Sequence, residues 1–132
     1  MNGRMFYPAI FQPEEEGGFS IYFPDVDGCI TQGDNMNESY EMAFDALGNM
    51  LSYLEESGKE IPIPSEPQTI QLVKDQFLVV IEFNMLEYKK KNDSRAVKKT
   101  LTIPSWLNEL AIRQNINFSQ VLQEALMSRL KQ

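Results

Sequence analysis

The sequence contains no histidine and only one cysteine, Cys29. Without histidine there is no imidazole base for a serine or cysteine triad, and the commonest transition-metal ligand is missing. A single cysteine excludes an intramolecular disulfide and a thiolate zinc site within one chain. The longest apolar runs, such as 77–81, have five residues, far below the ~20 that a membrane helix needs. The first residues leave no room for a signal-peptide core, so we expect a cytoplasmic protein without membrane contact.

Basic residues are scarce in the first two thirds of the chain. Residues 1–86 carry three basic and fifteen acidic side chains, for a charge of −12, whereas residues 87–132 carry nine basic and four acidic ones, for +5. The total of −7 and an apolar content of 42% in 132 residues fit a globular protein of one or two small domains. The asymmetry predicts two modules with different partners, of which the C-terminal one has the charge for nucleic acid.

Alternating apolar residues near the N-terminus predict three short strands. They are expected at Met5–Phe11, Phe19–Phe23 and Cys29–Gln32, separated by turns rich in glycine, proline and acidic residues. Pro8 indicates that the first strand lies at a sheet edge or contains a bulge, because proline cannot donate to the ladder.

A helix is predicted from about Met36 to Ser57. Asn35 and Glu38 have the spacing of a capping box, and Gly58 is placed to stop the helix. Apolar residues recur three and four positions apart at Tyr40, Ala43, Phe44, Leu47, Met50, Leu51 and Leu54.

Proline residues follow this helix and predict an extended connector. The segments Gln68–Lys74 and Gln76–Asn84 are expected to return to the sheet as strands. The module is therefore α+β, a small antiparallel or mixed sheet of about four or five strands with one helix covering one face.

The acidic residues of this module allow two interpretations. Asp25 and Asp27 have the character of a metal-binding pair, but we favour the simpler interpretation that they build a turn between strands. The run Glu14–Glu16 is more typical of a solvated hairpin tip than of a ligand set. Cys29 has no charged neighbour in sequence that would activate its thiol, so we expect a buried or half-buried strand residue. We predict no metal, no cofactor and no catalytic residue.

Residues 87–95 are polar and basic, which predicts a linker or a flexible arm. The next segment, Ala96–Ile103, predicts a strand whose residues alternate between two faces. Val97, Leu101 and Ile103 share the apolar face, while Lys98, Thr100 and Thr102 share the polar face.

Two short helices are predicted after this strand. Pro104 ends the strand and suits the first turn of a helix, which breaks at 115–117. Its apolar side holds Trp106, Leu107, Leu110 and Ala111. Asn117 is a good N-cap for the second helix. The apolar stripe of that helix consists of Phe118, Val121, Leu122, Ala125, Leu126 and Leu130.

One strand and two helices in ~37 residues cannot bury a core alone. The strand also lacks a partner within the module, which leaves both of its edges open. A symmetric dimer solves both problems, because two copies pair their strands into an antiparallel ribbon. We expect the dimer core to contain Leu101, Ile103, Trp106, Leu110, Val121, Leu122 and Leu126.

The ribbon would present Lys98, Thr100 and Thr102 of both chains on one polar face. A two-stranded ribbon fits the DNA major groove, and Lys and Thr are suitable readers of base edges. The alternative is that this face is only the solvated side of an ordinary strand. The second helix would also offer backbone N–H groups at its start to a phosphate. The predicted DNA-binding residues are Lys98, Lys99, Thr100, Thr102, Asn117, Phe118 and Ser119.

Two resemblances follow from these patterns. The segment Lys98–Leu130 resembles a ribbon–helix–helix DNA-binding domain of the MetJ/Arc type. The N-terminal half is similar to the HicB antitoxin family in Tyr7-Pro-Ala, in Phe19–Asp34, in the Glu-rich helix and in Ile61–Ser65. The phrase Phe-Pro-Asp-x-x-Gly-Cys-x-Thr-x-Gly-Asp within the second of these is specific to that family.

The resemblance implies a partial RNase H-like fold for residues 1–86, a basic linker at 87–95 and a ribbon–helix–helix domain at 96–132. It implies a small basic mRNA-cleaving toxin of the HicA type as partner, and operator DNA bound by a homodimer that represses its own operon. Whether such dimers join into a higher oligomer stays open. The acidic N-terminal module independently suits a basic partner. The candidate toxin-binding residues are Glu14, Glu15, Glu16, Tyr22, Asp25, Asp27 and Asp34.

An enzymatic reading is disfavoured by the first strand. An RNase H site needs carboxylates on its central strands to hold two metals, and Met5–Phe11 contains no acidic residue. We therefore predict a protein that is not an enzyme. The alternative is a stand-alone ribbon–helix–helix transcriptional regulator whose N-terminal domain senses a ligand or pairs chains. A reading frame for a small basic toxin beside this gene would separate the two.

Overall fold

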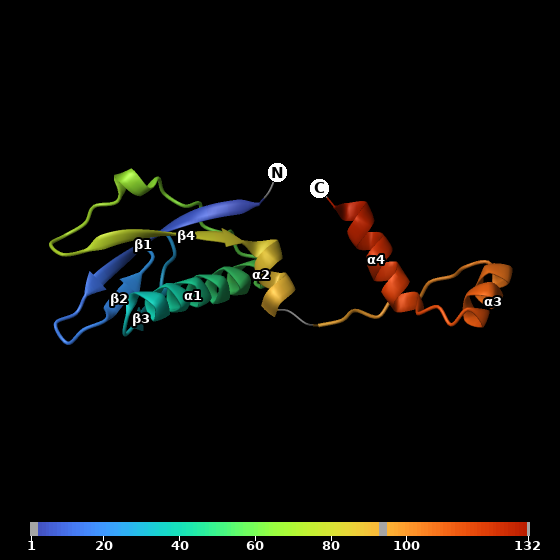
Figure 1. Cartoon of the computed structure of the whole chain (residues 1–132). Helices are drawn as coiled ribbons and strands as arrows, with labels where there is room; N and C mark the ends of the chain where they lie inside the picture. The colour runs from blue at the N-terminus through green and yellow to red at the C-terminus, as the bar shows by residue number, and fades with distance from the viewer. Residues whose placement is uncertain (1–2, 93–94, 132) are drawn as a thin grey trace. The chain divides into compact units, whose positions relative to one another are not determined.

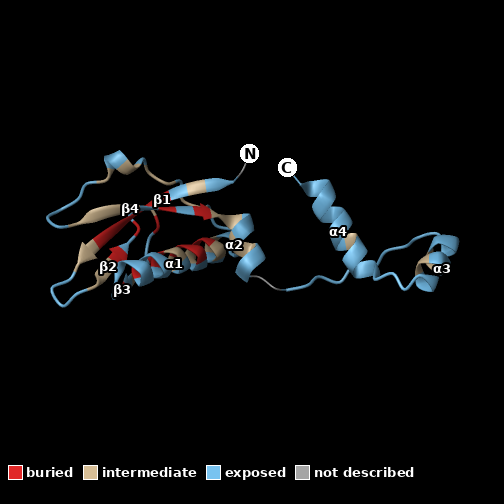
Figure 2. Cartoon of the chain, in the orientation of Figure 1, coloured by how far each residue is buried: buried red, intermediate tan, exposed pale blue. Residues whose placement is uncertain are grey.

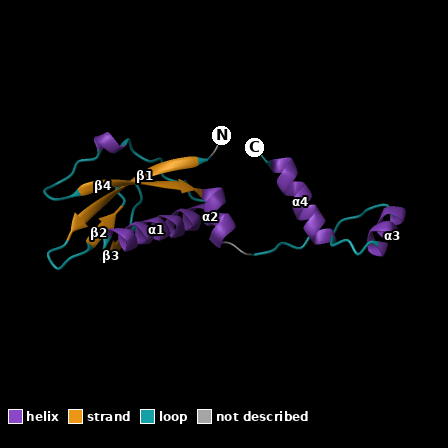
Figure 3. Ribbon diagram, viewed as in Figure 1, coloured by secondary structure: helices purple, strands orange, loops and turns teal. Residues whose placement is uncertain are grey.

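The computed structural model describes residues 3–92 and 95–131. Contacts divide the chain into two compact units, which we call unit 1 (residues 1–95) and unit 2 (residues 96–132). Unit 1 combines a sheet with helices, whereas unit 2 contains helices and loops (Figures 1 and 3). The α+β class predicted from the sequence is confirmed.

A four-stranded antiparallel sheet forms the centre of unit 1. Its order is β3-β2-β1-β4, for β1 (Arg4–Pro13), β2 (Phe19–Tyr22), β3 (Ile30–Gly33) and β4 (Phe77–Asn84). Phe11 lies opposite Ile21 in the β1–β2 pair, and Tyr7 lies opposite Ile81 in the β1–β4 pair. The first three strands occur where the sequence predicts them, with small shifts at their ends.

Helix α1 (Met36–Glu56) covers one face of this sheet (Figure 1). Tyr7, Ala9 and Phe11 alternate along β1 and are completely buried in the core beneath the helix. The helix contributes Ala43, Leu47 and Leu51 at four-residue spacing to the same core. Figure 2 shows the buried residues concentrated between the sheet and α1.

Both ends of α1 follow the predicted capping. The Asn35 side chain accepts a hydrogen bond from the Glu38 backbone N–H at 2.8 Å. The Glu38 carboxylate accepts from the Asp34 N–H at 2.9 Å, one residue earlier than in a standard capping box. Gly58 has a φ of +72°, and the next residue's N–H donates back to the Leu54 carbonyl, which ends the helix.

The strand predicted at Gln68–Lys74 is wrong. Pro67 begins a short 3-10 turn, η1 (Pro67–Thr69), and irregular chain leads from there to β4. Pro67 suits the start of such a turn, because its φ is fixed and it needs no N–H there. The alternation of β1 directs Pro8 and Ile10 away from α1, yet both are buried. In Figure 1 the η1 segment lies on the side of the sheet opposite α1.

The predicted edge position of Pro8 is also wrong, because β1 is an inner strand. Its pairing with β2 is limited to Ile10–Pro13, whereas its pairing with β4 runs from Arg4 to Phe11. At Pro8 the strand therefore has β4 as neighbour on one side only. The missing N–H of proline deprives no β2 carbonyl of a partner there.

The basic segment predicted as a linker is largely a helix, α2 (Met85–Asn92), within unit 1. Tyr88 packs its ring on α1 at Gly48, where an added Cβ would lie 2.2 Å from the ring. The Tyr88 hydroxyl donates to the Asn49 side chain at 2.9 Å. The lysine-rich composition hides this single aromatic anchor, which explains the wrong prediction. Residues 93–94 of the expected linker lie outside the described residues.

Unit 2 contains α3 (Ser105–Arg113) and α4 (Phe118–Leu130), both close to their predicted positions. Asn115, with a φ of +57°, lies in the break between them. None of residues 96–131 is buried (Figure 2). Residues 96–104 form no strand in the single chain. The strand predicted at Ala96–Ile103 needs a second chain as its partner, so the ribbon stays a prediction.

Candidate functional site

The predicted base-reading residues lie together on the segment before α3. Lys98, Lys99, Thr100 and Thr102 are all exposed there. Their backbone groups take no part in a sheet within the single chain. The segment is thus available for pairing with another strand.

The start of α4 provides a second polar feature in unit 2. The Asn117 side chain accepts a hydrogen bond from the Gln120 N–H at 3.0 Å, which confirms the predicted N-cap. Phe118 and Ser119 form the exposed first turn. The N–H groups of a first turn have no partner within their own helix and can donate to an anion.

The predicted dimer-core residues leave a large apolar surface uncovered. Trp106 is 64% exposed and Leu101 62% exposed. Lower but still high exposures, between 46% and 49%, are found for Ile103, Leu110, Val121 and Leu126. Leu122 is partly buried. Apolar side chains exposed to this extent along a whole unit indicate an association surface.

The structure brings together some of the acidic residues predicted to meet a toxin. Glu14, Glu16 and Asp34 line one polar hollow at the β1–β2 hairpin tip. The Glu14 carboxylate accepts a hydrogen bond from the Ser20 hydroxyl at 2.8 Å. Glu15 is exposed on the same turn. This group is called the hairpin-tip cluster below.

Asp25 has a different environment. Its carboxylate accepts hydrogen bonds from the Ser65 N–H at 2.8 Å and the Ser65 hydroxyl at 2.6 Å, which ties the proline-rich connector to the β2–β3 turn. Burial and the nearby charge of Asp25 raise the pKa of Tyr7 to about 12. Asp27 is exposed in the same turn, and Tyr22 is 39% exposed on β2. The contacts of Asp25 agree with the turn interpretation rather than with a metal pair.

A second acidic surface was missed by the sequence reasoning. A groove lies between α1, the end of β4 and α2, and we call it the α1–α2 groove. Its carboxylates are Glu41, Asp45, Glu82 and Glu87, and its rings are Tyr40, Phe44 and Tyr88. Burial and the charge of Asp45 raise the pKa of Tyr88. The signal available in the sequence was an α1 segment with five carboxylates and no Lys or Arg.

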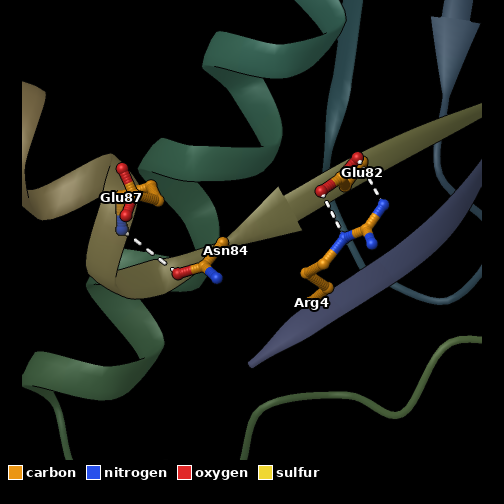
Figure 4. A network of polar contacts seen from close by, with 4 residues as sticks. All are labelled: Arg4, Glu82, Asn84 and Glu87. Atoms are coloured by element: carbon orange, nitrogen blue, oxygen red, sulfur yellow. Dashed lines mark hydrogen bonds and ion pairs between the residues drawn. The ribbon is translucent and has the colours of Figure 1, made fainter. Parts of the chain in front are cut away.

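The rim of this groove is organised by the end of β4 (Figure 4). Arg4 on β1 forms a two-pronged ion pair with Glu82, at 2.7 Å and 3.2 Å. The Asn84 side chain accepts a hydrogen bond from the Glu87 N–H at 3.1 Å and caps α2. Strand β4 and helix α2 are therefore fixed relative to each other at this corner.

Two basic side chains of the segment 87–95 lie against the C-terminal end of α1. Lys89 forms an ion pair with Glu55, and Arg95 forms one with Glu56 at 3.7 Å. Negative charge at a helix C-terminus is unfavourable, and these cations offset it. All four side chains are at least 40% exposed, so the pairs are weak and can exchange.

No group of three or more metal-ligating side chains occurs within residues 3–92 and 95–131. The Cys29 thiol is buried, and burial raises its pKa to about 11. Because the thiolate is the reactive form, a thiol with a raised pKa is a poor nucleophile, as expected for a structural cysteine. Among the described helices, none is long and apolar enough to cross a membrane.

The fold and surfaces define a two-part protein: a self-contained acidic α+β unit followed by a helical unit with an uncovered apolar surface. The family model for the HicB-like antitoxin of bacterial toxin–antitoxin systems matches residues 7–128. The chain therefore belongs to the HicB-like antitoxin family.

Among relatives in sequence, the chain is 43% identical over 61 residues to Antitoxin HicB 1 of Photorhabdus laumondii, covering 46% of this chain and 39% of that protein. It is 38% identical over 61 residues to Antitoxin HicB of Escherichia coli K12, covering 46% and 44% of the two chains. The matches thus span less than half the length of these curated relatives.

Solved structures extend the similarity over the whole chain. A chain of a toxin–antitoxin complex from Streptococcus pneumoniae is 28% identical with a TM-score of 0.60, covering 96% of this chain and 99% of that one. The antitoxin HicB3 crystal structure is 26% identical with a TM-score of 0.54, covering 96% and 98%. The Burkholderia pseudomallei antitoxin HicB, at 14% identity and a TM-score of 0.57 over 96% and 99%, supports the fold alone.

Proposed function

We propose that this protein is an antitoxin that neutralises a small basic HicA-type toxin with unit 1 and represses its own operon with unit 2. Family membership and the likeness to a chain of a toxin–antitoxin complex support the first half. In this proposal the protein is a regulator, and the RNA-cleaving chemistry belongs to the toxin.

The two units differ in how many of their residues are buried, and this difference is the main support for giving them separate roles. Unit 1 buries its own core, including Tyr7, Phe11 and Phe83 at 0% exposure. Unit 2 buries none of its described residues and exposes an apolar surface from Leu101 to Leu130. A unit of that kind reaches a stable fold by association, so we propose a homodimer through unit 2.

A ribbon–helix–helix arrangement accounts for the polar features of unit 2. Two copies of residues 96–103 would pair as an antiparallel ribbon with Lys98, Thr100 and Thr102 facing the major groove of operator DNA. Asn117 and the first turn of α4 would hold a phosphate beside it. Unit 2 carries five basic and two acidic residues, which favours DNA, whereas unit 1 carries seven basic and seventeen acidic ones.

The experiment that tests the proposal compares fragments 1–95 and 96–132 with the full chain. Fragment 1–95 should fold, bind the toxin encoded beside this gene and block its RNA cleavage, but should not bind operator DNA. Its association rate should fall as salt rises, because attraction between the acidic unit and a basic partner is screened within ~10 Å at 0.1 M salt. Fragment 96–132 should dimerise and bind operator DNA.

Protection of RNA by fragment 96–132 and not by 1–95 would reverse the assignment of the two units. The alternative, a stand-alone regulator, predicts operator binding by the full chain and no toxin in the neighbouring reading frame.

A further inference from the structure

The negative charge of α1 is neutralised at one end and not in the middle. Glu55 and Glu56 near the C-terminal end pair with Lys89 and Arg95. Glu41 and Asp45 lie one turn apart in the middle of the helix, and no cation within the described residues forms an ion pair with either. Like charges at this spacing destabilise a helix. The chain thus maintains an unfavourable pair of charges on an exposed surface.

These two carboxylates border the α1–α2 groove, which also has an aromatic lining. Tyr40 is 41% exposed, and Phe44 and Tyr88 are partly exposed beside it. Tyr88 is held in place by its seat on Gly48 and its hydrogen bond to Asn49. A preformed hollow with ring faces and carboxylates is suited to a Lys or Arg side chain, which binds both kinds of group.

The cations of unit 1 itself do not satisfy this groove. Arg4 is engaged by both oxygens of Glu82 at the rim. Glu87 pairs with Lys90 at 3.4 Å, and Lys91 also lines the groove. Within the part of the chain that the structure describes, Glu41 and Asp45 are thus the groove carboxylates that form no ion pair. The excess of negative charge points to a cationic group from another molecule.

We propose that the α1–α2 groove is the docking site for a basic side chain of the toxin, held between Tyr40 and Tyr88 and paired with Glu41 and Asp45. This inference rests on the proposed antitoxin function and names the surface that performs it. It places the main contact away from the hairpin-tip cluster, where Glu14 already accepts a bond from Ser20. Because Tyr88 belongs to α2, the toxin would contact the helix that leads toward unit 2.

The test uses the full chain and the purified toxin encoded beside its gene. The groove variant is Glu41→Gln with Asp45→Asn, and the matched control is Glu60→Gln with Glu66→Gln, two exposed positions outside both the groove and the hairpin-tip cluster. Both variants remove two negative charges from exposed positions of unit 1, so long-range attraction changes equally. The groove variant relieves a repulsion within α1, so its thermal stability should not fall. Toxin affinity is measured by titration at moderate and high salt, together with inhibition of RNA cleavage.

The groove variant should bind the toxin about tenfold or more weakly at both salt concentrations, and the control should stay within about threefold of the unchanged protein. Tyr40→Ala should weaken binding in the same direction. Equal losses in both variants, or a loss confined to the control, would overturn the groove as the docking site. Unchanged toxin binding by the groove variant would also overturn it. Failure of the unchanged protein to bind the toxin at all would instead reject the proposed function.

Discussion

The two units of this protein obtain their stability from different sources. In unit 1, the sheet and α1 bury side chains from β1, β4 and the helix within one chain. In unit 2, the largest side chain, Trp106, is 64% exposed, and the described residues provide no buried core. Unit 1 can therefore fold before it binds a partner, whereas in the proposed dimer folding and association of unit 2 are a single equilibrium.

The same contrast appears in the electrostatics. Unit 1 has an excess of carboxylates, and the ion pairs among its described residues neutralise Glu82, Glu87 and the two carboxylates at the end of α1. Unit 2 has an excess of cations, of which Lys98 and Lys99 lie on the segment that has no strand partner in the single chain. Each unit therefore presents the charge opposite to that of its proposed partner.

The largest expected effect comes from Leu101→Asp. In the proposed dimer this substitution buries a carboxylate without a partner at the two-fold interface, which is strongly unfavourable. Dimerisation, the helical content of unit 2 and operator binding should be lost together, while unit 1 stays folded. Sedimentation and circular dichroism measure both effects.

The matched control for this prediction is Thr100→Asp, which adds the same charge one position away on the polar face. It should remain dimeric and lose only DNA binding. A Leu101→Asp protein that remains dimeric through unit 2 with unchanged helical content would contradict the proposed interface.

The next largest effect is a loss of DNA binding with the fold unchanged. Replacing Lys98, Thr100 and Thr102 together with alanine should abolish operator-specific binding, because these residues are the only proposed readers of base edges. The dimer and toxin neutralisation should survive, since the changed side chains are exposed and belong to unit 2. Gel-shift titration at fixed moderate salt against operator and unrelated DNA measures the loss. Unchanged operator affinity would show that the polar face is only solvated.

The sequence predicted what depends on local pattern. The capping of α1 by Asn35, the cap of α4 by Asn117 and the first three strands follow from short-range periodicity and side-chain chemistry. The apolar surface of unit 2 was predictable for the same reason, because its spacing is helical. The expectation of a second chain, which stays a prediction, followed from the small size of unit 2 and from its unpaired strand.

What the sequence did not predict depends on contacts between distant residues. The η1 turn and irregular chain stand in place of an expected strand, and the connector before them is tied to the β2–β3 turn by the hydrogen bonds from Ser65 to Asp25. Helix α2 forms in a lysine-rich segment because Tyr88 has a seat at Gly48, which lies 40 positions earlier. The α1–α2 groove depends on α2, so it was missed with it.

The smallest effect is expected for Gly48→Ala, which tests the packing of Tyr88 of α2 against Gly48 of α1. Intrinsic helix propensity alone would make this change stabilising by about 1 kcal/mol, since Gly48 lies inside α1. The new Cβ would lie 2.2 Å from the Tyr88 ring, however, and that ring is held by Phe44, Phe83 and the Asn49 hydrogen bond. Displacing it should outweigh the propensity gain and destabilise unit 1 by about 1–2 kcal/mol, as overpacking usually does. Urea denaturation of fragment 1–95 measures the change.

In a Tyr88→Ala background the obstacle is gone, so Gly48→Ala should become stabilising there. If Gly48→Ala changes the free energy of unfolding with the same sign in both backgrounds, Tyr88 does not determine how α2 packs on α1.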